Sequence, residues 1–221
     1  MSLFASAVGR KVLMGVTGLF MLLFVVAHLL GNSSIFAGRE AINAYAEHLH
    51  ALGPLVWIAR IVMGTMLVVH MFFGIILTME NSDANPTKYA VNKMLKATFF
   101  SQTMIWTGLL ILAFLAFHLA QFTLRITPDI TAEAAAKKPG DVFGMVATSF
   151  KYLSVFVVYI AAMVALFCHL QHGVQSLFQS LGLSNKEAQP KIVASGKVVS
   201  TLLLLGYCAI PVAIITGILT K

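Results

Sequence analysis

The chain has 221 residues, of which 59% are hydrophobic and only 10% are charged. A water-soluble domain carries about 25% charged residues, so this composition excludes an ordinary soluble protein. The formal net charge is +7, but the basic residues gather at the ends of apolar runs, where membrane topology accounts for them. We therefore expect no nucleic acid partner and an integral membrane protein surrounded by lipid.

Five apolar runs follow one another along the chain. A helix needs about 20 apolar residues to cross the hydrocarbon core of a bilayer. The expected fold is all-α, with residues 1–221 forming one transmembrane domain, an integral membrane bundle of five transmembrane helices. The expected spans cover roughly residues 12–30, 55–79, 97–126, 152–181 and 198–219. Residues 41–52 are amphipathic and predict a helix lying along the outer interface, and we expect no internal repeat.

The charges between the runs predict the orientation. If the N-terminus is cytoplasmic, eight basic and three acidic residues lie on that side, against six basic and five acidic residues on the other. Basic residues are enriched on the cytoplasmic side of membrane proteins. The pattern therefore predicts a cytoplasmic N-terminus and a C-terminus outside.

Four of the seven histidines lie inside apolar runs, one in each of the first four. A titratable group in hydrocarbon is costly, and its default explanation is a functional partner. A hydrogen bond between helices explains a single such histidine equally well, but it is a weak explanation for four on successive helices. The residues are His28, His70, His118 and His169.

The depth of these histidines sorts them into two pairs. At about 1.5 Å of rise per residue, His28 and His118 lie toward the outside, and His70 and His169 lie toward the cytoplasm. This pattern predicts two bis-histidine haems b stacked across the membrane, whose six-coordinate irons transfer electrons rather than bind oxygen. His172 shares a helix face with His169, so either could be the ligand, with His172 better placed to contact a haem edge.

At these residues the chain resembles a known family, the single-subunit, two-haem cytochrome b membrane anchors of succinate dehydrogenases and fumarate reductases, which are succinate:quinone oxidoreductases. The resemblance extends through four of the five expected helices. The fourth segment is the most specific, because His-x-x-His-Gly is followed by Gln-Ser-x-x-Gln-Ser. The similar segments are GLFMLLFVVAHLLGN, LVWIARIVMGTMLVVHMFFGI, TMIWTGLLILAFLAFHL and FCHLQHGVQSLFQSLGL.

The resemblance implies partners and a pathway. It pairs the first expected helix with the third and the second with the fourth, and it favours His169 over His172 as the ligand. It implies a flavoprotein subunit with FAD and an iron–sulfur subunit, both on the cytoplasmic face of a bacterial membrane. Electrons would pass between the iron–sulfur clusters, the two haems and menaquinone, in a subunit without dicarboxylate activity of its own. A dimer of whole complexes is left open.

The resemblance also implies a quinone site near the outer haem, with an acidic residue close to it. Glu47 is the nearest carboxylate in this sequence, and proton exchange with a quinone needs such a group. A solvated loop carboxylate is the alternative interpretation of Glu47.

Two other classes of protein remain open at this point. One is a different membrane cytochrome b, of the hydrogenase or formate dehydrogenase type. The other is a transporter or structural anchor without redox function, which would show ionisable residues along a cavity or paired breaks in its helices. Apart from Arg60 and the histidines, the expected spans are nearly free of charge.

Overall fold

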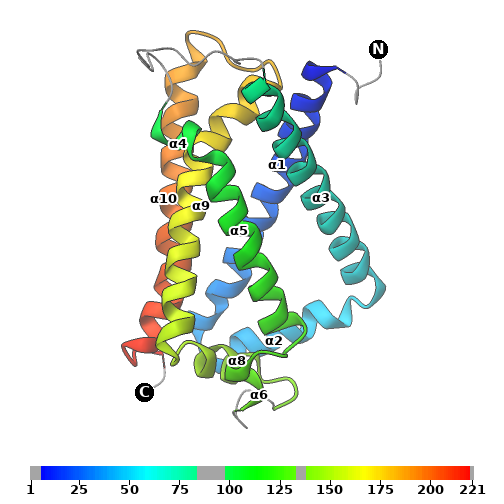
Figure 1. The fold of residues 1–221 in the computed structure, drawn as a ribbon. Coiled ribbons are helices and arrows are strands. Elements are labelled where there is room, and N and C mark those ends of the chain that lie inside the picture. Colours follow the sequence, from blue (N-terminus) through cyan, green and yellow to red (C-terminus); the bar gives the residue numbers. More distant parts are fainter. Residues whose placement is uncertain (1–5, 84–97, 133–137, 220–221) are drawn as a thin grey trace.

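The structure, a computed structural model, describes residues 6–83, 98–132 and 138–219, and all regular structure in these residues is helical. Five segments are long and apolar enough to cross a membrane, which confirms the predicted all-α bundle (Figure 1). Their main helices are α1 (Ala7–Asn32), α3 (Pro54–Asp83), α5 (Met104–His118), α9 (Leu153–Ser180) and α10 (Ala188–Ile215). The shorter elements are η1 (Ser33–Ala37), α2 (Arg39–Ala51), α4 (Phe99–Gln102), η2 (Leu119–Thr123), α6 (Pro128–Thr131) and α8 (Val142–Ser149).

The third apolar run is divided rather than continuous. Its expected start at residue 97 lies outside the described residues. Thr98 caps α4 by accepting a hydrogen bond from the Ser101 N–H at 3.2 Å, and the chain leaves helical geometry at Thr103 before α5 begins. After His118 the helix widens into the π-helical turn η2, in which the Leu124 N–H donates to the carbonyl oxygen five residues back at 2.8 Å.

Helix α10 starts well before the expected apolar run at residue 198. Its first turn contains Pro190, which is tolerated there because the first N–H groups of a helix have no partner inside the helix. The polar residues that follow, including Lys191 and Lys197, are compatible with a helix that continues beyond the hydrocarbon core. Hydropathy alone therefore detects only the apolar part of this helix.

Small residues bring the long helices close together. A Cβ atom added to Gly15 on α1 would lie 3.2 Å from Cβ of Ser180 on α9, and one added to Gly196 on α10 would lie 3.4 Å from Cβ of Val174 on α9. Close backbone approach of this kind is how helices associate in lipid. Helix α10 thereby lies along α9 (Figure 1), and α9 also packs against α1 and α5.

At the end of the bundle opposite the N-terminus, α2 runs across the bundle rather than along it (Figure 1). Gly38 makes the turn into α2 with a φ of 101°, which glycine adopts without strain. Ile42 of α2 is buried in an apolar cluster that includes Ile35, Phe143 and Ile214. The helix expected over residues 41–52 is thus present as α2, and its apolar side packs against the protein.

Asp141 joins α2 to α8. Its carboxylate accepts hydrogen bonds from the Gly144 N–H at 3.0 Å, which caps α8, and from the Asn43 amide of α2 at 3.1 Å. It also forms an ion pair with Arg39, whose guanidinium lies 4.8 Å from the centre of the Phe143 ring. Burial alone would raise the pKa of Asp141. The hydrogen bonds and the positive charge of Arg39 outweigh burial and hold that pKa below its ordinary value of 3.8.

A carboxyl group with a lowered pKa stabilises the fold above its ordinary pKa and loses that contribution as pH falls. We expect Asp141→Ala to lower the free energy of unfolding by about 1–2 kcal/mol at pH 7, as loss of a helix cap does. Thermal unfolding in detergent would measure it. The difference from wild type should shrink below pH 3.8, the ordinary pKa of this carboxyl. Asp83→Ala, at the exposed end of α3, is the matched control. An equal loss of stability in both variants would contradict the role of Asp141 in joining α2 to α8.

Candidate functional site

The four histidines inside the long helices lie in two pairs. The ring centres of His28 on α1 and His118 on α5 are 6.0 Å apart, with an angle of 87° between the ring planes. Those of His70 on α3 and His169 on α9 are 6.4 Å apart, at 63°. The first pair lies toward the end of the bundle with α2, and the second toward the N-terminal end of α1. We call them the α2-end pair and the N-end pair; their role as haem ligands stays a prediction.

His70 of the N-end pair is held by α1. Its Nδ1 lies 3.1 Å from the carbonyl oxygen of Met14 and 3.3 Å from Oγ1 of Thr17. A carbonyl oxygen can only accept, so Nδ1 carries a proton, and in the neutral imidazole that burial favours Nε2 has the lone pair. Gly18 makes room for the ring, because a Cβ atom there would lie 3.2 Å from Cε1 of His70.

His169 of the N-end pair is held by α5 in the same manner. Its Nδ1 lies 3.1 Å from Oγ1 of Thr107, whose own hydroxyl donates to the carbonyl oxygen of Thr103 at 3.0 Å. The Thr107 oxygen must therefore accept from His169, which again places the proton on Nδ1 and the lone pair on Nε2. Gly108 lies against the ring, since a Cβ atom there would be 3.4 Å from Cε1 of His169.

The α2-end pair reaches the same protonation state with other partners. His118 Nδ1 lies 2.9 Å from the hydroxyl of Tyr159, which donates its only hydrogen to Oε1 of Gln121 at 2.6 Å. His118 Nδ1 therefore donates, and its Nε2 has the lone pair. At His28 the bond is to Nε2, which accepts from the Asn32 amide at 3.1 Å, so Nε2 again has the lone pair. Burial in an apolar bundle favours the neutral imidazole, and in that form all four rings have the lone pair on Nε2.

This arrangement suits a metal held between two imidazoles. A metal–nitrogen distance of about 2.0 Å on each side, plus about 1 Å from nitrogen to ring centre, gives about 6 Å between ring centres. The observed separations are 6.0 and 6.4 Å. In the described part of the chain no three His, Cys, Asp or Glu side chains gather around one point. Each pair therefore offers two imidazole nitrogens, a donor set that suits iron.

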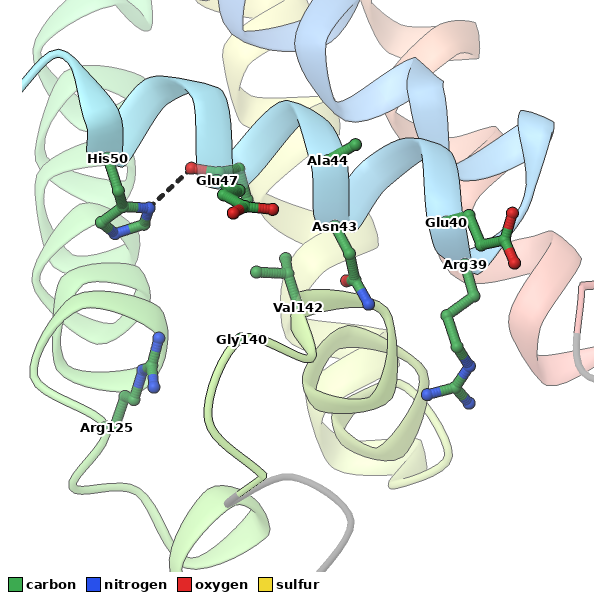
Figure 2. Close-up of a pocket in the computed structure, with 10 residues that line it drawn as sticks. Arg39, Glu40, Asn43, Ala44, Glu47, His50, Arg125, Gly140 and Val142 are labelled. Carbon is green, nitrogen blue, oxygen red and sulfur yellow. Dashed lines mark hydrogen bonds between the residues drawn. The ribbon is translucent and has the colours of Figure 1, made fainter.

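Glu47 lines a pocket of about 720 Å³ at the α2 end of the bundle (Figure 2). One wall of this pocket is α2, and the others are Arg125, which follows η2, and the approach to α8. Arg125 has a φ of 57°, the left-handed conformation that side chains other than glycine seldom adopt. The lining residues are Arg39, Glu40, Asn43, Ala44, Ala46, Glu47, His50, Arg125, Gly140 and Val142.

His172 lies on α9 one turn beyond His169, and its side chain is half-buried. His48 and His50 are exposed on α2, and Nδ1 of His50 lies 2.7 Å from the carbonyl oxygen of Ala46 in its own helix. The structure therefore places these three histidines outside the two pairs.

The residues that support the histidines were not predicted from the sequence, although a signal for two of them exists. Thr17 precedes His28 by eleven residues, and Thr107 precedes His118 by the same number. The two segments, TGLFMLLFVVAH and TGLLILAFLAFH, share six of twelve residues. The expectation of no internal repeat is therefore wrong. Eleven residues make about three helical turns and about 16 Å of rise. Each of α1 and α5 therefore carries a histidine of the α2-end pair and, about three turns before it, a threonine that holds a histidine of the N-end pair.

These features define a multi-pass membrane protein whose bundle positions paired, neutral histidines. A family model described as succinate dehydrogenase/fumarate reductase transmembrane subunit matches residues 79–206, more than half of the chain. The chain belongs to this family and is a membrane subunit of an oxidoreductase complex, in which it assembles with the other subunits. The matched region includes His118 and His169. Searches of curated proteins and of solved structures found no match.

Proposed function

We propose that the chain is the dihaem cytochrome b anchor of its succinate dehydrogenase or fumarate reductase complex. Two haems b would be held by His28 with His118 and by His70 with His169. The observation that supports this most strongly is the common protonation state of the four imidazoles, each with a lone pair on Nε2, in pairs whose ring centres are 6.0 and 6.4 Å apart.

The protein's own contribution is to fix these imidazoles in a medium without water. Histidine ligands in metal sites donate their second N–H to a protein acceptor, which sets the ring orientation. Here Thr17 with Met14, Thr107 with Met104, and Tyr159 serve as acceptors for three rings. The Asn32 amide donates to Nε2 of His28 and would have to release it for this nitrogen to hold a metal. A haem held by each pair would supply a one-electron centre. His172 would contact the edge of the haem at the N-end pair.

The order of the electron carriers follows from the orientation predicted by the loop charges. With the N-terminus in the cytoplasm of a bacterial cell, the N-end pair faces the cytoplasmic side of the inner membrane. The flavoprotein and iron–sulfur subunits would bind there, so electrons would pass between the iron–sulfur clusters, the N-end pair, the α2-end pair and menaquinone. Dicarboxylate chemistry would belong to the flavoprotein subunit alone.

Glu47 is our candidate for proton exchange with menaquinone. It lines the pocket at the α2 end, on the side of the bundle where the outer haem would lie. Quinone reduction takes up protons, and a carboxylate within reach of bulk water can deliver them. The exposed position of Glu47 on α2 meets that requirement.

Replacing His28 or His118 by alanine should remove the outer haem, and replacing His70 or His169 should remove the inner one. Each variant should fall from two haems per chain to one, because the remaining axial ligand cannot hold the iron alone. Pyridine haemochrome assays with reduced-minus-oxidised spectra on the purified complex would count them. His48→Ala, exposed on α2, should keep both haems. If all four variants also kept both, the ligand assignment would be wrong.

Thr107→Val removes the hydroxyl that accepts from His169 while keeping the side-chain shape. We expect the inner haem to bind about tenfold more weakly, the usual effect of losing a partner of a metal ligand. Thr17→Val should have a comparable effect on the same haem, because each histidine keeps a backbone partner, Met14 for His70 at 3.1 Å and Met104 for His169. Haem transfer to a scavenging apoprotein would measure the loss.

Thr65→Val is the matched control for these two variants, because the Thr65 hydroxyl bonds only within α3, to the Ile61 carbonyl oxygen at 2.9 Å. Unchanged haem retention in Thr107→Val would show that Thr107 does not support His169.

Glu47→Gln should slow quinone turnover by about 100-fold, the contribution expected of a positioned acid or base, while both haems remain bound. Glu40→Gln is the control, because Glu40 lies on the same helix and lines the same pocket. Turnover of the intact complex with a soluble menaquinone analogue would compare them. Equal turnover in the two variants would return Glu47 to the role of a surface carboxylate.

A further inference from the structure

Three consecutive hydrogen bonds connect His118 to a carboxylate. His118 Nδ1 lies 2.9 Å from the Tyr159 hydroxyl, and that hydroxyl lies 2.6 Å from Oε1 of Gln121. The Gln121 amide donates to Oδ2 of Asp129 at 2.7 Å. We call this the Asp129 chain, and it joins α5, η2, α6 and α9.

All three hydrogen bonds of the Asp129 chain donate in the same direction, from His118 toward Asp129. A carboxylate accepts, so Asp129 fixes the amide of Gln121 with its NH₂ group toward the acid and its oxygen toward Tyr159. That oxygen takes the hydroxyl hydrogen of Tyr159, and the hydroxyl oxygen is left to accept from His118. The acid thus determines, through two neutral side chains, which nitrogen of His118 carries the proton.

The fold supports this chain closely. Gln121 is completely buried, Asp129 is 5% exposed and Tyr159 is 8% exposed, so water does not compete for their bonds. Gln121 lies inside the π-helical turn η2 that begins directly after His118. Such turns are rare and concentrate at functional sites. The Tyr159 ring is further held edge-on by Phe114 and Phe150, with ring centres at 4.9 and 4.7 Å.

We propose that Asp129, Gln121 and Tyr159 are positioning residues that hold His118 as the outer haem ligand and lower the reduction potential of that haem. The inference rests on the proposed haem function. A donor N–H polarised toward a carboxylate makes the imidazole a stronger base, and a more basic ligand stabilises the oxidised iron. At the N-end pair the described acceptors are neutral, namely threonine hydroxyls and backbone carbonyls, so the effect is confined to the outer haem.

The test is an optical redox titration of the purified complex, with the outer haem identified as the one that His118→Ala removes. Tyr159→Phe breaks the chain at the ligand, and Asp129→Asn removes its charge while keeping its shape. We expect the reduction equilibrium of the outer haem to shift by about tenfold toward the reduced form in Tyr159→Phe, which is 59 mV for one electron. Asp129→Asn should shift it in the same direction, and the inner haem should not change.

Matched controls lie at the same end of the bundle. Tyr207 is near His28, with ring centres 6.3 Å apart, but its hydroxyl donates to the Val25 carbonyl oxygen at 2.7 Å instead of accepting from a histidine. Tyr207→Phe and Asp141→Asn should leave the potential of the outer haem close to that of the wild type.

The outcomes separate the two proposals. Wild-type complex without two haems would overturn the proposed function before any variant is compared. Two haems with an outer potential unchanged in both Tyr159→Phe and Asp129→Asn would overturn only the role of the Asp129 chain. If Tyr159→Phe loses the outer haem or does not fold, Asp129→Asn, at the far end of the chain, decides: a rise in the outer potential supports that role and an unchanged potential overturns it.

Discussion

An imidazole inside a lipid-embedded bundle needs a partner for its N–H group, and the rest of the site depends on this constraint. No water is present in the hydrocarbon core to take the place of a protein acceptor. Each of the four histidines therefore requires a polar neighbour within a nearly uncharged span. At His70, His118 and His169 the neighbour accepts from Nδ1, whereas at His28 the Asn32 amide donates to Nε2. These contacts specify which ring nitrogen carries the proton.

At the N-end pair both histidines are held in the same way, whereas at the α2-end pair the two histidines have different partners. Helices α1 and α5 each contain a Thr-Gly pair, in which threonine accepts from a histidine of the neighbouring helix and glycine makes room for its ring. Eleven residues later each of these helices presents its own histidine, on the same face. Because a rigid helix connects the two levels, a displacement of α1 or α5 changes the geometry of both pairs together.

Among the described residues, most of the short elements lie at the α2 end of the bundle. There the chain forms a π-helical turn, several short helices and the transverse helix α2, and the joint made by Asp141 fixes α2 to α8. Two buried or partly buried carboxylates, Asp129 and Asp141, have distinct roles in this region. Asp129 acts through side chains on His118, whereas Asp141 caps a helix and holds the wall of the pocket that Glu47 lines.

The sequence by itself determined the membrane class, the five spans and the one histidine in each of four helices, because backbone groups in lipid must bond within a helix and so require long apolar runs. It also contained the Thr-Gly repeat, which a comparison of the runs against each other detects. Only the tertiary structure decided that Tyr159 reaches His118 and that Gln121 reaches both Tyr159 and Asp129. These contacts join residues 41, 38 and 8 positions apart. They depend on the rotation of each helix about its axis and on a π-helical turn. Neither feature produces a periodic pattern in the sequence, because both are set by how side chains pack between helices.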